Sequence, residues 1–381
     1  MFFRSGGYIM ANRYSEVLIG PHHVAIDITN KCNLRCLHCY NSSGENDVIK
    51  TELSDHEVLE FMKSLSTINL YSLCLCGGEP LLRKELIFDS LKILTENGIR
   101  TSMVTNGLLA TEDTLAKLDE LGLNSIQFSL DGNKASHDKL RNQAGAYKQV
   151  LKAIEYVLKN TGMHLSIAFS PTRFNINDIT EVYDLLKRLF IESGRDEEND
   201  FIDLRCQPLM ILGRAKKHQD IIPSEFQYRK LVNTVRRLEV EGDAKIIQIT
   251  WGDPVDHLIR YKNANNLLDQ VVVHANGDIV VSAYLPLVIG NIRKHSLKEY
   301  WDKGLNKVWS TKIVQFLVSK MVSISEMDEI TNVISDINMD SVLYIDLIDN
   351  DLNDMTVIKD IVDKIKHYSK LGNCETRGAR S

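Results

Sequence analysis

The sequence predicts an α/β protein whose largest part is a parallel β-sheet. Apolar runs rich in β-branched residues alternate with amphipathic segments over the first two thirds of the chain, and polar motifs directly follow several of these runs. Alternating strands and helices favour parallel strands joined by right-handed crossovers. The expected strands cover residues 24–30, 71–76, 101–105, 125–130, 164–170 and 201–207.

Amphipathic segments between these runs have apolar residues at helical spacing, as in HEVLEFMKSLSTI and AYKQVLKAIEYVLKNTG. Gly98, Gly122 and Gly162 each follow such a segment, in the position where glycine commonly ends a helix. Each strand is therefore expected to be followed by a helix, which gives six β/α units before about residue 215.

The composition limits the classes of function. The chain has 381 residues, of which 44% are hydrophobic and 25% charged, with a formal net charge of −6. A negative charge argues against nucleic-acid binding, which normally requires a basic surface. No apolar run has transmembrane length, and the N-terminus lacks the apolar core of a signal peptide. With seven cysteines, we expect a cytoplasmic protein that uses thiols for metal ligation, with no membrane or nucleic-acid partner.

Three cysteines, Cys32, Cys36 and Cys39, form a C-x3-C-x2-C motif after the first expected strand. Thiolates are soft ligands that suit zinc or iron–sulfur clusters. A structural zinc site usually pairs C-x2-C with a distant second pair, and this chain has none. A [4Fe–4S] cluster held by three thiolates would leave one iron open to a small molecule.

Three further motifs stand at the ends of expected strands. They are Gly77-Gly78-Glu79-Pro80, Thr105-Asn106-Gly107 and Ser129-Leu130-Asp131-Gly132. In a parallel β/α barrel, chemistry gathers at the carboxyl ends of the strands. Together with the cysteine motif, these residues resemble the radical S-adenosylmethionine (SAM) superfamily from about His23 to about Pro208.

This resemblance implies a partial (βα)6 TIM-like barrel with one [4Fe–4S] cluster and SAM as cofactors. Cys32, Cys36 and Cys39 match the cluster ligands, and the open iron would be chelated by SAM. The implied reaction is reductive cleavage of SAM to a 5′-deoxyadenosyl radical, with an electron donor such as flavodoxin or ferredoxin as partner. The cofactors carry this chemistry, and the protein positions and shields them.

The resemblance also implies which residues contact SAM. Gly77 and Gly78 would let the backbone approach the cofactor, and Glu79 would accept a hydrogen bond from its ammonium group. Arg141 would pair with the SAM carboxylate through its guanidinium group. The other residues expected to lie beside SAM or substrate are Tyr40, Asn106, Ser129, Asp131, Asn175 and Pro208.

The C-terminal third resembles the SPASM or twitch extension of the peptide-modifying subgroup. We expect an N-terminal segment at 1–22, the barrel at 23–215, a bridging region with a hairpin and helix at 216–310, and an α/β cap at 311–381. Asn276-Gly277 is a strong hairpin signal. Ser282 stands where the extension's first cysteine is expected, and Cys374 is alone near the C-terminus, so we interpret this α+β extension as lacking a cluster.

Without a second cluster, a substrate radical needs another way to end. A thiol could return a hydrogen atom, as in epimerisation, and Cys206 is the first candidate if it faces the barrel interior. Cys74 and Cys76 are less favoured because they are most simply explained as core residues.

The substrate remains open between a ribosomally made peptide, which we favour, to be cross-linked or epimerised, and a sugar, nucleoside or other small molecule. An iron–sulfur electron carrier or an inert peptide-binding scaffold are alternatives of another class.

Overall fold

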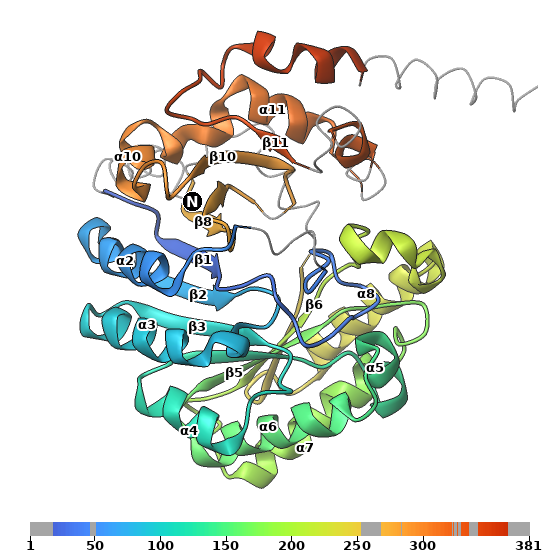
Figure 1. The fold of residues 1–381 in the computed structure, drawn as a ribbon. Helices are drawn as coiled ribbons and strands as arrows, with labels where there is room; N and C mark the ends of the chain where they lie inside the picture. The colour runs from blue at the N-terminus through green and yellow to red at the C-terminus, as the bar shows by residue number, and fades with distance from the viewer. Residues whose placement is uncertain are drawn as a thin grey trace, which may run out of the picture. The chain divides into compact units, whose positions relative to one another are not determined.

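The computed structural model describes residues 18–45, 51–252, 268–282, 284–321, 323, 326, 329–334 and 342–364 (Figure 1). The chain forms two compact units. The barrel unit comprises His23–Pro254 and Val273–Asn276, and the C-terminal unit comprises Met1–His22, Val255–Val272 and Gly277–Ser381.

An open parallel sheet forms the centre of the barrel unit, as the sequence predicts. Each strand pairs in parallel with the next along the chain. The strands are β1 (His23–Asp27), β2 (Ser72–Cys76), β3 (Arg100–Thr105), β4 (Ser125–Ser129), β5 (His164–Phe169), β6 (Ile202–Cys206) and β7 (Ile247–Trp251). The last of these, β7, extends the sheet beyond the six expected β/α units.

Helices lie along one face of this sheet (Figure 1). They are α2 (Asp55–Leu65), α3 (Lys84–Glu96), α4 (Glu112–Glu120), α5 (Lys134–Arg141), α6 (Ala146–Asn160), α7 (Ile179–Ser193) and α8 (Glu225–Glu241). Local sequence fixes several starts: Ser54 and Glu57 form a capping box on α2, and Asn133 caps α5. Leu91, Val150 and Leu186 are fully buried on the inner sides of α3, α6 and α7.

The two faces of the barrel sheet differ in chemistry. Phe128, Ile167 and Leu204 are paired neighbours on β4, β5 and β6, and all three are fully buried. The alternate positions carry Ser129, Ala168 and Arg205, which are half-buried or exposed. Since paired residues of neighbouring strands point to the same side of a sheet, one face is apolar under the helices and the other is polar.

Within the C-terminal unit the strands are β8 (Gln270–Val273), which continues into the barrel unit, β9 (Asp278–Val280), β10 (Leu287–Asn291) and β11 (Leu343–Tyr344). The strands β8 and β9 flank Asn276-Gly277, where the hairpin was expected, and Gly277 has a φ of +90°. The helices are α10 (Leu297–Asp302) and α11 (Lys312–Ser319).

The core of this unit includes fully buried Tyr300 and Trp309. The hydroxyl of Tyr300 donates to Asp346 at 2.9 Å and accepts from the backbone of Asn291 at 3.0 Å. Ser282 is buried, and Cys374 lies outside the described residues. No helix in the described parts of the chain is long and apolar enough to cross a membrane.

Candidate active site

Cys32, Cys36 and Cys39 lie on the loop that follows β1, and all three thiols are free of disulfides. Arg35 holds this loop together. Its guanidinium group donates to the carbonyl oxygens of Cys32 at 2.8 Å and Gly44 at 2.5 Å. The loop therefore has a defined shape that its own arginine maintains across the three cysteines.

Arg214, after β6, is a second arginine on this loop, and it is 6% exposed. It donates to the carbonyl oxygens of Cys36 and Ser43, both at 2.9 Å, and to the carboxylate of Glu45 at 2.9 Å. Its own backbone N–H donates to the carbonyl oxygen of Cys39 at 2.9 Å. Five guanidinium donors in a rigid fork suit this role, because one side chain can hold several carbonyl groups.

Sequence reasoning missed Arg214, although it stands in the segment RCQPLMILGRA that also contains Pro208. Gly213 was the available signal. It has a φ of +52°, and a Cβ there would lie 2.3 Å from the carbonyl oxygen of Tyr40. A glycine that permits close backbone approach next to an arginine marks this contact, but its partner is far away in sequence.

Gly77 and Gly78 pack against the start of the cysteine loop. A Cβ on Gly77 would lie 2.4 Å from the carbonyl oxygen of Thr29, and one on Gly78 would lie 2.3 Å from that of Lys31. Gly78 N–H donates to Thr29 at 2.7 Å, and Glu79 N–H donates to Lys31 at 2.9 Å. The space that these glycines leave open is thus filled by the cysteine loop, which fixes the loop beside Glu79.

Glu79 is fully buried between β2 and β3. One carboxylate oxygen accepts from the Thr105 hydroxyl at 2.8 Å and the Leu81 N–H at 3.1 Å, and the other accepts from the Asn106 N–H at 2.9 Å. Burial raises the pKa of this carboxyl, and these hydrogen bonds oppose the rise. A carboxylate has about four acceptor positions, so Glu79 retains capacity for one more donor.

Asn106, beside Glu79, also reaches the cysteine loop. Its amide N–H donates to the side chain of Asn33 at 2.8 Å, while its carbonyl oxygen accepts from the Leu108 N–H at 3.0 Å. Asn33 immediately follows Cys32. The end of β3 is therefore connected to the first cysteine as well as to Glu79.

Asp131 and Arg141 form a buried ion pair beside Cys36. Asp131 is 0% exposed, and one of its oxygens lies 2.5 Å from Arg141 Nη2 and 2.7 Å from Nε. Arg141 Nη1 lies 3.8 Å from the sulfur of Cys36. Burial raises the pKa of the Asp131 carboxyl, but the charge of Arg141 outweighs it and leaves the pKa below its ordinary value. A permanent cation is thus held against a cysteine thiol.

Two histidines lie close to this pair. Burial lowers the pKa of His38 to about 3 and that of His137 to about 4, so both rings are neutral at physiological pH. Within the described part of the chain, His38 Nδ1 and His137 Nε2 are buried and have no hydrogen-bond partner. Buried polar atoms without a hydrogen-bond partner, such as these near Cys36 and Cys39, are unusual in a protein core.

Asn175 supports the backbone of Asp131. Its amide N–H donates to the carbonyl oxygens of Asp131 at 2.7 Å and Ser170 at 2.9 Å, and its oxygen accepts from Thr172 N–H at 2.5 Å. Asn175 therefore shapes the loop that holds Asp131. Its polar atoms are engaged by backbone groups and by the Thr172 hydroxyl, which donates to its oxygen at 2.9 Å.

The remaining expected contacts are less closely gathered. Ser129 ends β4 on the polar face of the sheet, Tyr40 is 50% exposed, and Pro208 is buried after β6.

Cys206 ends β6 and is 0% exposed. Its paired neighbour on β5 is Phe169, also buried, so its thiol belongs to the apolar face. Burial raises the pKa of this thiol. By contrast, Cys74 and Cys76 alternate on β2 with buried Leu73 and Leu75 and are partly exposed. The sheet register places this pair on the polar face of the sheet, opposite to Cys206.

The donor set fits an iron–sulfur cluster. Burial raises the pKa of Cys32 to about 11 and also raises that of Cys36, so both thiolates require a cationic partner. Among the described residues, no three His, Cys, Asp or Glu side chains converge to hold a single metal ion. A cubane cluster does not require such convergence, because each thiolate binds a different iron. Arg141 supplies positive charge beside Cys36. His38, next to Cys39 in sequence, has a buried ring nitrogen without a hydrogen-bond partner.

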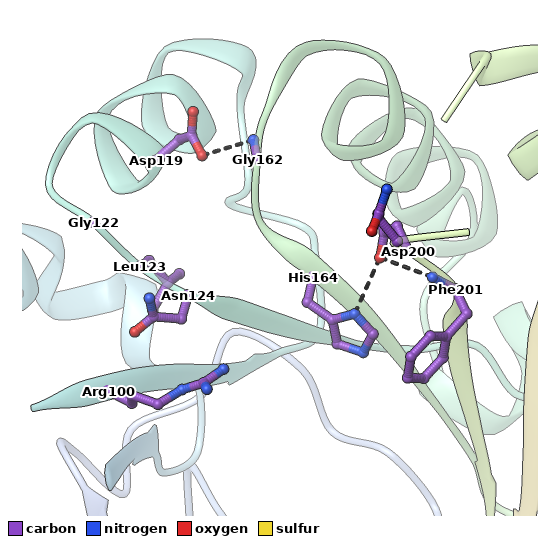
Figure 2. A pocket seen from close by; sticks show the side chains of 10 residues that line it. Arg100, Asp119, Gly122, Leu123, Asn124, Gly162, His164, Asp200 and Phe201 are labelled. Atoms are coloured by element: carbon purple, nitrogen blue, oxygen red, sulfur yellow. Dashed lines mark hydrogen bonds and ion pairs between the residues drawn. The ribbon is translucent and has the colours of Figure 1, made fainter. Parts of the chain in front are cut away.

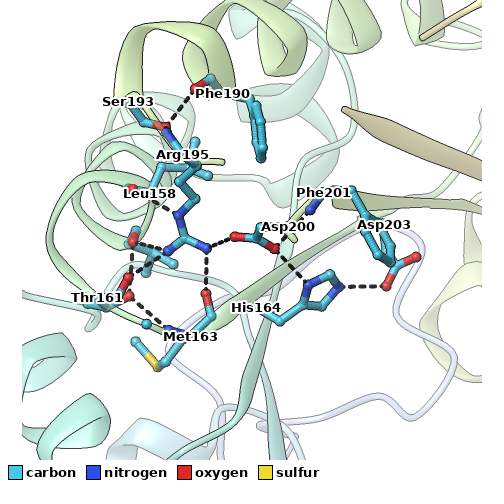
Figure 3. Close-up of polar contacts among 12 residues, drawn as sticks. Leu158, Thr161, Met163, His164, Phe190, Ser193, Arg195, Asp200, Phe201 and Asp203 are labelled. Carbon is cyan, nitrogen blue, oxygen red and sulfur yellow. Dashed lines mark hydrogen bonds and ion pairs between the residues drawn. The ribbon is translucent and has the colours of Figure 1, made fainter. Parts of the chain in front are cut away.

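A separate cavity of about 700 Å³ lies at the opposite, amino-terminal end of the strands (Figure 2). Its lining includes Arg100, Asn124, His164, Asp200 and Phe201. Figure 3 shows the network beside it, in which Asp200 contacts both His164 and Arg195. The guanidinium group of Arg195 also donates to carbonyl oxygens of Val157, Leu158, Thr161 and Met163.

The cysteine loop, Glu79 and the Asp131–Arg141 pair lie together at the carboxyl ends of parallel strands, where enzymes with a parallel β/α barrel carry their chemistry. Residues 26–186 match the family model described as the radical SAM superfamily. The chain therefore contains a radical SAM domain, and enzymes of this superfamily use a [4Fe–4S] cluster and SAM as cofactors.

Characterised relatives are enzymes. An "AdoMet-dependent heme synthase" of Methanosarcina barkeri is 26% identical over 305 residues, which cover 74% of this chain and 83% of that protein. A "GTP 3',8-cyclase" of Clostridium perfringens is 28% identical over 236 residues, covering 60% and 69%. The solved structure of Streptococcus suis SuiB bound to S-adenosylmethionine has the same fold, with a TM-score of 0.59, 16% identity, and coverage of 89% of this chain and 79% of SuiB.

Proposed function

We propose that this enzyme reductively cleaves SAM and uses the resulting radical to remove a hydrogen atom from a ribosomally made peptide. The observation that carries the first half is the site at the carboxyl ends of the barrel strands. There the cysteine loop contacts both Glu79 and the Asp131–Arg141 pair, at distances of 2.5 to 3.8 Å within this group. The peptide substrate is the second half of the proposal and rests on the fold similarity given below.

In this proposal Cys32, Cys36 and Cys39 hold the cluster. When bound, the reduced cluster would supply the one electron for reductive cleavage of the SAM sulfonium group. Glu79 uses its remaining acceptor position for the SAM ammonium group. Asp131 holds the guanidinium group of Arg141 beside Cys36. There Arg141 would stabilise the Cys36 thiolate and pair with the SAM carboxylate.

The same proposal assigns contacts with SAM or substrate to Tyr40, Asn106 and Ser129. Gly77, Gly78, Asn175 and Pro208 act through the backbone that they shape, since Gly78 contacts the cysteine loop and Asn175 holds the backbone of Asp131. A low-potential one-electron donor such as flavodoxin or ferredoxin would supply the electron.

Support for a peptide substrate comes from fold similarity that extends beyond the barrel. SuiB shares the fold over 89% of this chain, and a second solved structure shows SuiB bound to its precursor peptide SuiA, with a TM-score of 0.57 and 17% identity. A small molecule, such as a sugar or nucleoside, is the second candidate. It is favoured by the sequence relatives, among them the heme synthase and the GTP cyclase.

Coexpression of the protein with each short peptide encoded beside its gene, followed by mass spectrometry of the peptide, tests the substrate. We expect a change in mass or in residue configuration that is absent when Cys39→Ala replaces the wild type. Formation of 5′-deoxyadenosine by the purified protein, without a change in any such peptide, would favour the small molecule. Absence of 5′-deoxyadenosine under reducing, anaerobic conditions would contradict the enzyme itself.

A further inference from the structure

Two thiols lie together on the polar face of the barrel sheet. Cys74 and Cys76 occupy alternate positions of β2, so both point to the same side, and their sulfur atoms are 3.2 Å apart. Both side chains are partly exposed. Cys76 directly precedes Gly77-Gly78-Glu79, so the pair lies one residue from the motif that contacts the cysteine loop.

The neighbours of this pair are polar. In the sheet register Cys74 lies between Ala25 and Ser102, and Cys76 lies beside Asp27. The Asp27 carboxylate lies 2.9 Å from His274 Nδ1. The charge of Arg205, which projects from β6 on the same polar face, also acts on Cys74. A thiol pair that only filled a core would be surrounded by apolar side chains instead.

Cys206 does not share this environment. It has the paired position of Phe169 on the apolar face and is 0% exposed, whereas a hydrogen donor must reach the substrate. The hydrogen bond between the two thiols lowers the pKa of Cys74 and raises that of Cys76. Cys76 ends β2 and directly precedes Gly77, so it is the member of the pair nearer to the motif that contacts the cysteine loop.

We propose that Cys76, with Cys74 as its partner, is the hydrogen-atom donor that ends the substrate radical in the barrel. This inference rests on the proposed function, because it requires a carbon radical there. It makes the net change to the substrate redox-neutral, as in inversion at a carbon atom, rather than oxidative.

Hydrogen transfer from Cys76 leaves a thiyl radical, so restoring the thiol requires one reductant. The S–H bond of Cys76 breaks and a C–H bond forms on the substrate, which leaves a thiyl radical on Cys76. The sulfur of Cys74, 3.2 Å away, shares the unpaired electron. One electron from a low-potential donor of the flavodoxin or ferredoxin class and one proton from water then restore the thiol.

Phenylarsine oxide, which binds two neighbouring thiols, tests the arrangement without turnover. With the cluster in place, wild-type protein should bind one equivalent, and Cys74→Ala or Cys76→Ala should each abolish this binding. Cys206→Ala is the matched control and should bind like wild type. Binding that survives either change on β2 would show that the two thiols do not act as a pair.

SAM itself is the probe for the donor role, because the radical can take hydrogen from the nearest thiol when no substrate is present. We expect cleavage of SAM in deuterated water, with dithionite as reductant and no added thiol, to place one deuterium in 5′-deoxyadenosine. A thiol hydrogen exchanges with solvent and a carbon-bound hydrogen does not. Cys76→Ala should lower this deuterium to background while SAM cleavage continues, and Cys206→Ala should leave it unchanged.

These outcomes separate the two proposals. Absence of 5′-deoxyadenosine in wild type would overturn the proposed function. Normal cleavage without deuterium in wild type, or with undiminished deuterium in Cys76→Ala, would overturn the donor assignment and leave SAM cleavage intact.

Discussion

The two ends of the barrel both bury charged groups, but they use them differently. At the amino-terminal end, the guanidinium group of Arg195 is engaged by Asp200 and by carbonyl oxygens of the surrounding loops. At the carboxyl end, Arg141 pairs with Asp131 and reaches the sulfur of Cys36, while Glu79 keeps an acceptor position free. A cavity of about 700 Å³ lies beside the amino-terminal network.

This difference indicates that unsatisfied bonding capacity marks the reactive end. A network whose donors all have acceptors within the protein can stabilise a fold but has no donor left to offer a ligand. Free thiols, orphaned histidine nitrogens and a partly filled carboxylate remain at the carboxyl end. Active sites of parallel β/α barrels generally lie at this carboxyl end of the strands.

The largest expected effect concerns iron. Anaerobically reconstituted protein should hold about four irons per chain, because the triad supplies the ligands of one cluster. Replacing Cys32, Cys36 and Cys39 together with alanine should remove essentially all of it. Iron and sulfide analysis measures this, and about eight irons per chain would instead show a second cluster and contradict the prediction of a clusterless extension.

A second prediction concerns the Asp131–Arg141 pair. Arg141→Met would leave the fully buried Asp131 carboxylate without its cation, which should lower the free energy of unfolding by roughly 3–5 kcal/mol. Urea denaturation of the protein without its cofactors measures this. Adding Asp131→Asn should recover part of the loss, because the uncompensated charge is then removed. Equal stability of Arg141→Met and wild type would mean that this ion pair does not form.

Much of this carboxyl end could be predicted from sequence because its motifs are local. The spacing of Cys32, Cys36 and Cys39 and the position of Glu79 after an apolar run are visible in the chain itself. Arg214 escaped prediction because its carbonyl partners lie far away in sequence. The face of Cys206 also depends on register with Phe169, and a slip of one residue would reverse it.

Glu79→Gln should have a smaller effect than loss of the ion pair, and on binding rather than folding. The amide keeps the shape of the carboxylate but replaces an ionised acceptor for the SAM ammonium group, so SAM binding should weaken by roughly 1.5–3 kcal/mol. Equilibrium binding of SAM to the reconstituted protein measures this. Glu52→Gln, on a neighbouring carboxylate that accepts from Thr29, is the control. Unchanged binding by Glu79→Gln would mean that Glu79 only joins β2 to β3.

The smallest expected effect belongs to the amino-terminal end and should leave SAM binding unaffected. Hydrogen bonds from His164 to Asp200 and Asp203, at 3.3 and 2.9 Å, raise its pKa from 6.5 to about 9. A raised pKa in the folded state means that folding takes up protons. The contribution of His164 to stability is therefore complete below about pH 6.5 and is lost as the pH rises through about 9.

Because these side chains are partly exposed, we expect His164 to contribute only about 1 kcal/mol to the free energy of unfolding. The free energy of unfolding of wild type minus that of His164→Gln, measured by urea denaturation across this range, should fall as the pH rises. A difference that grows with pH would show that His164 is neutral in the folded protein.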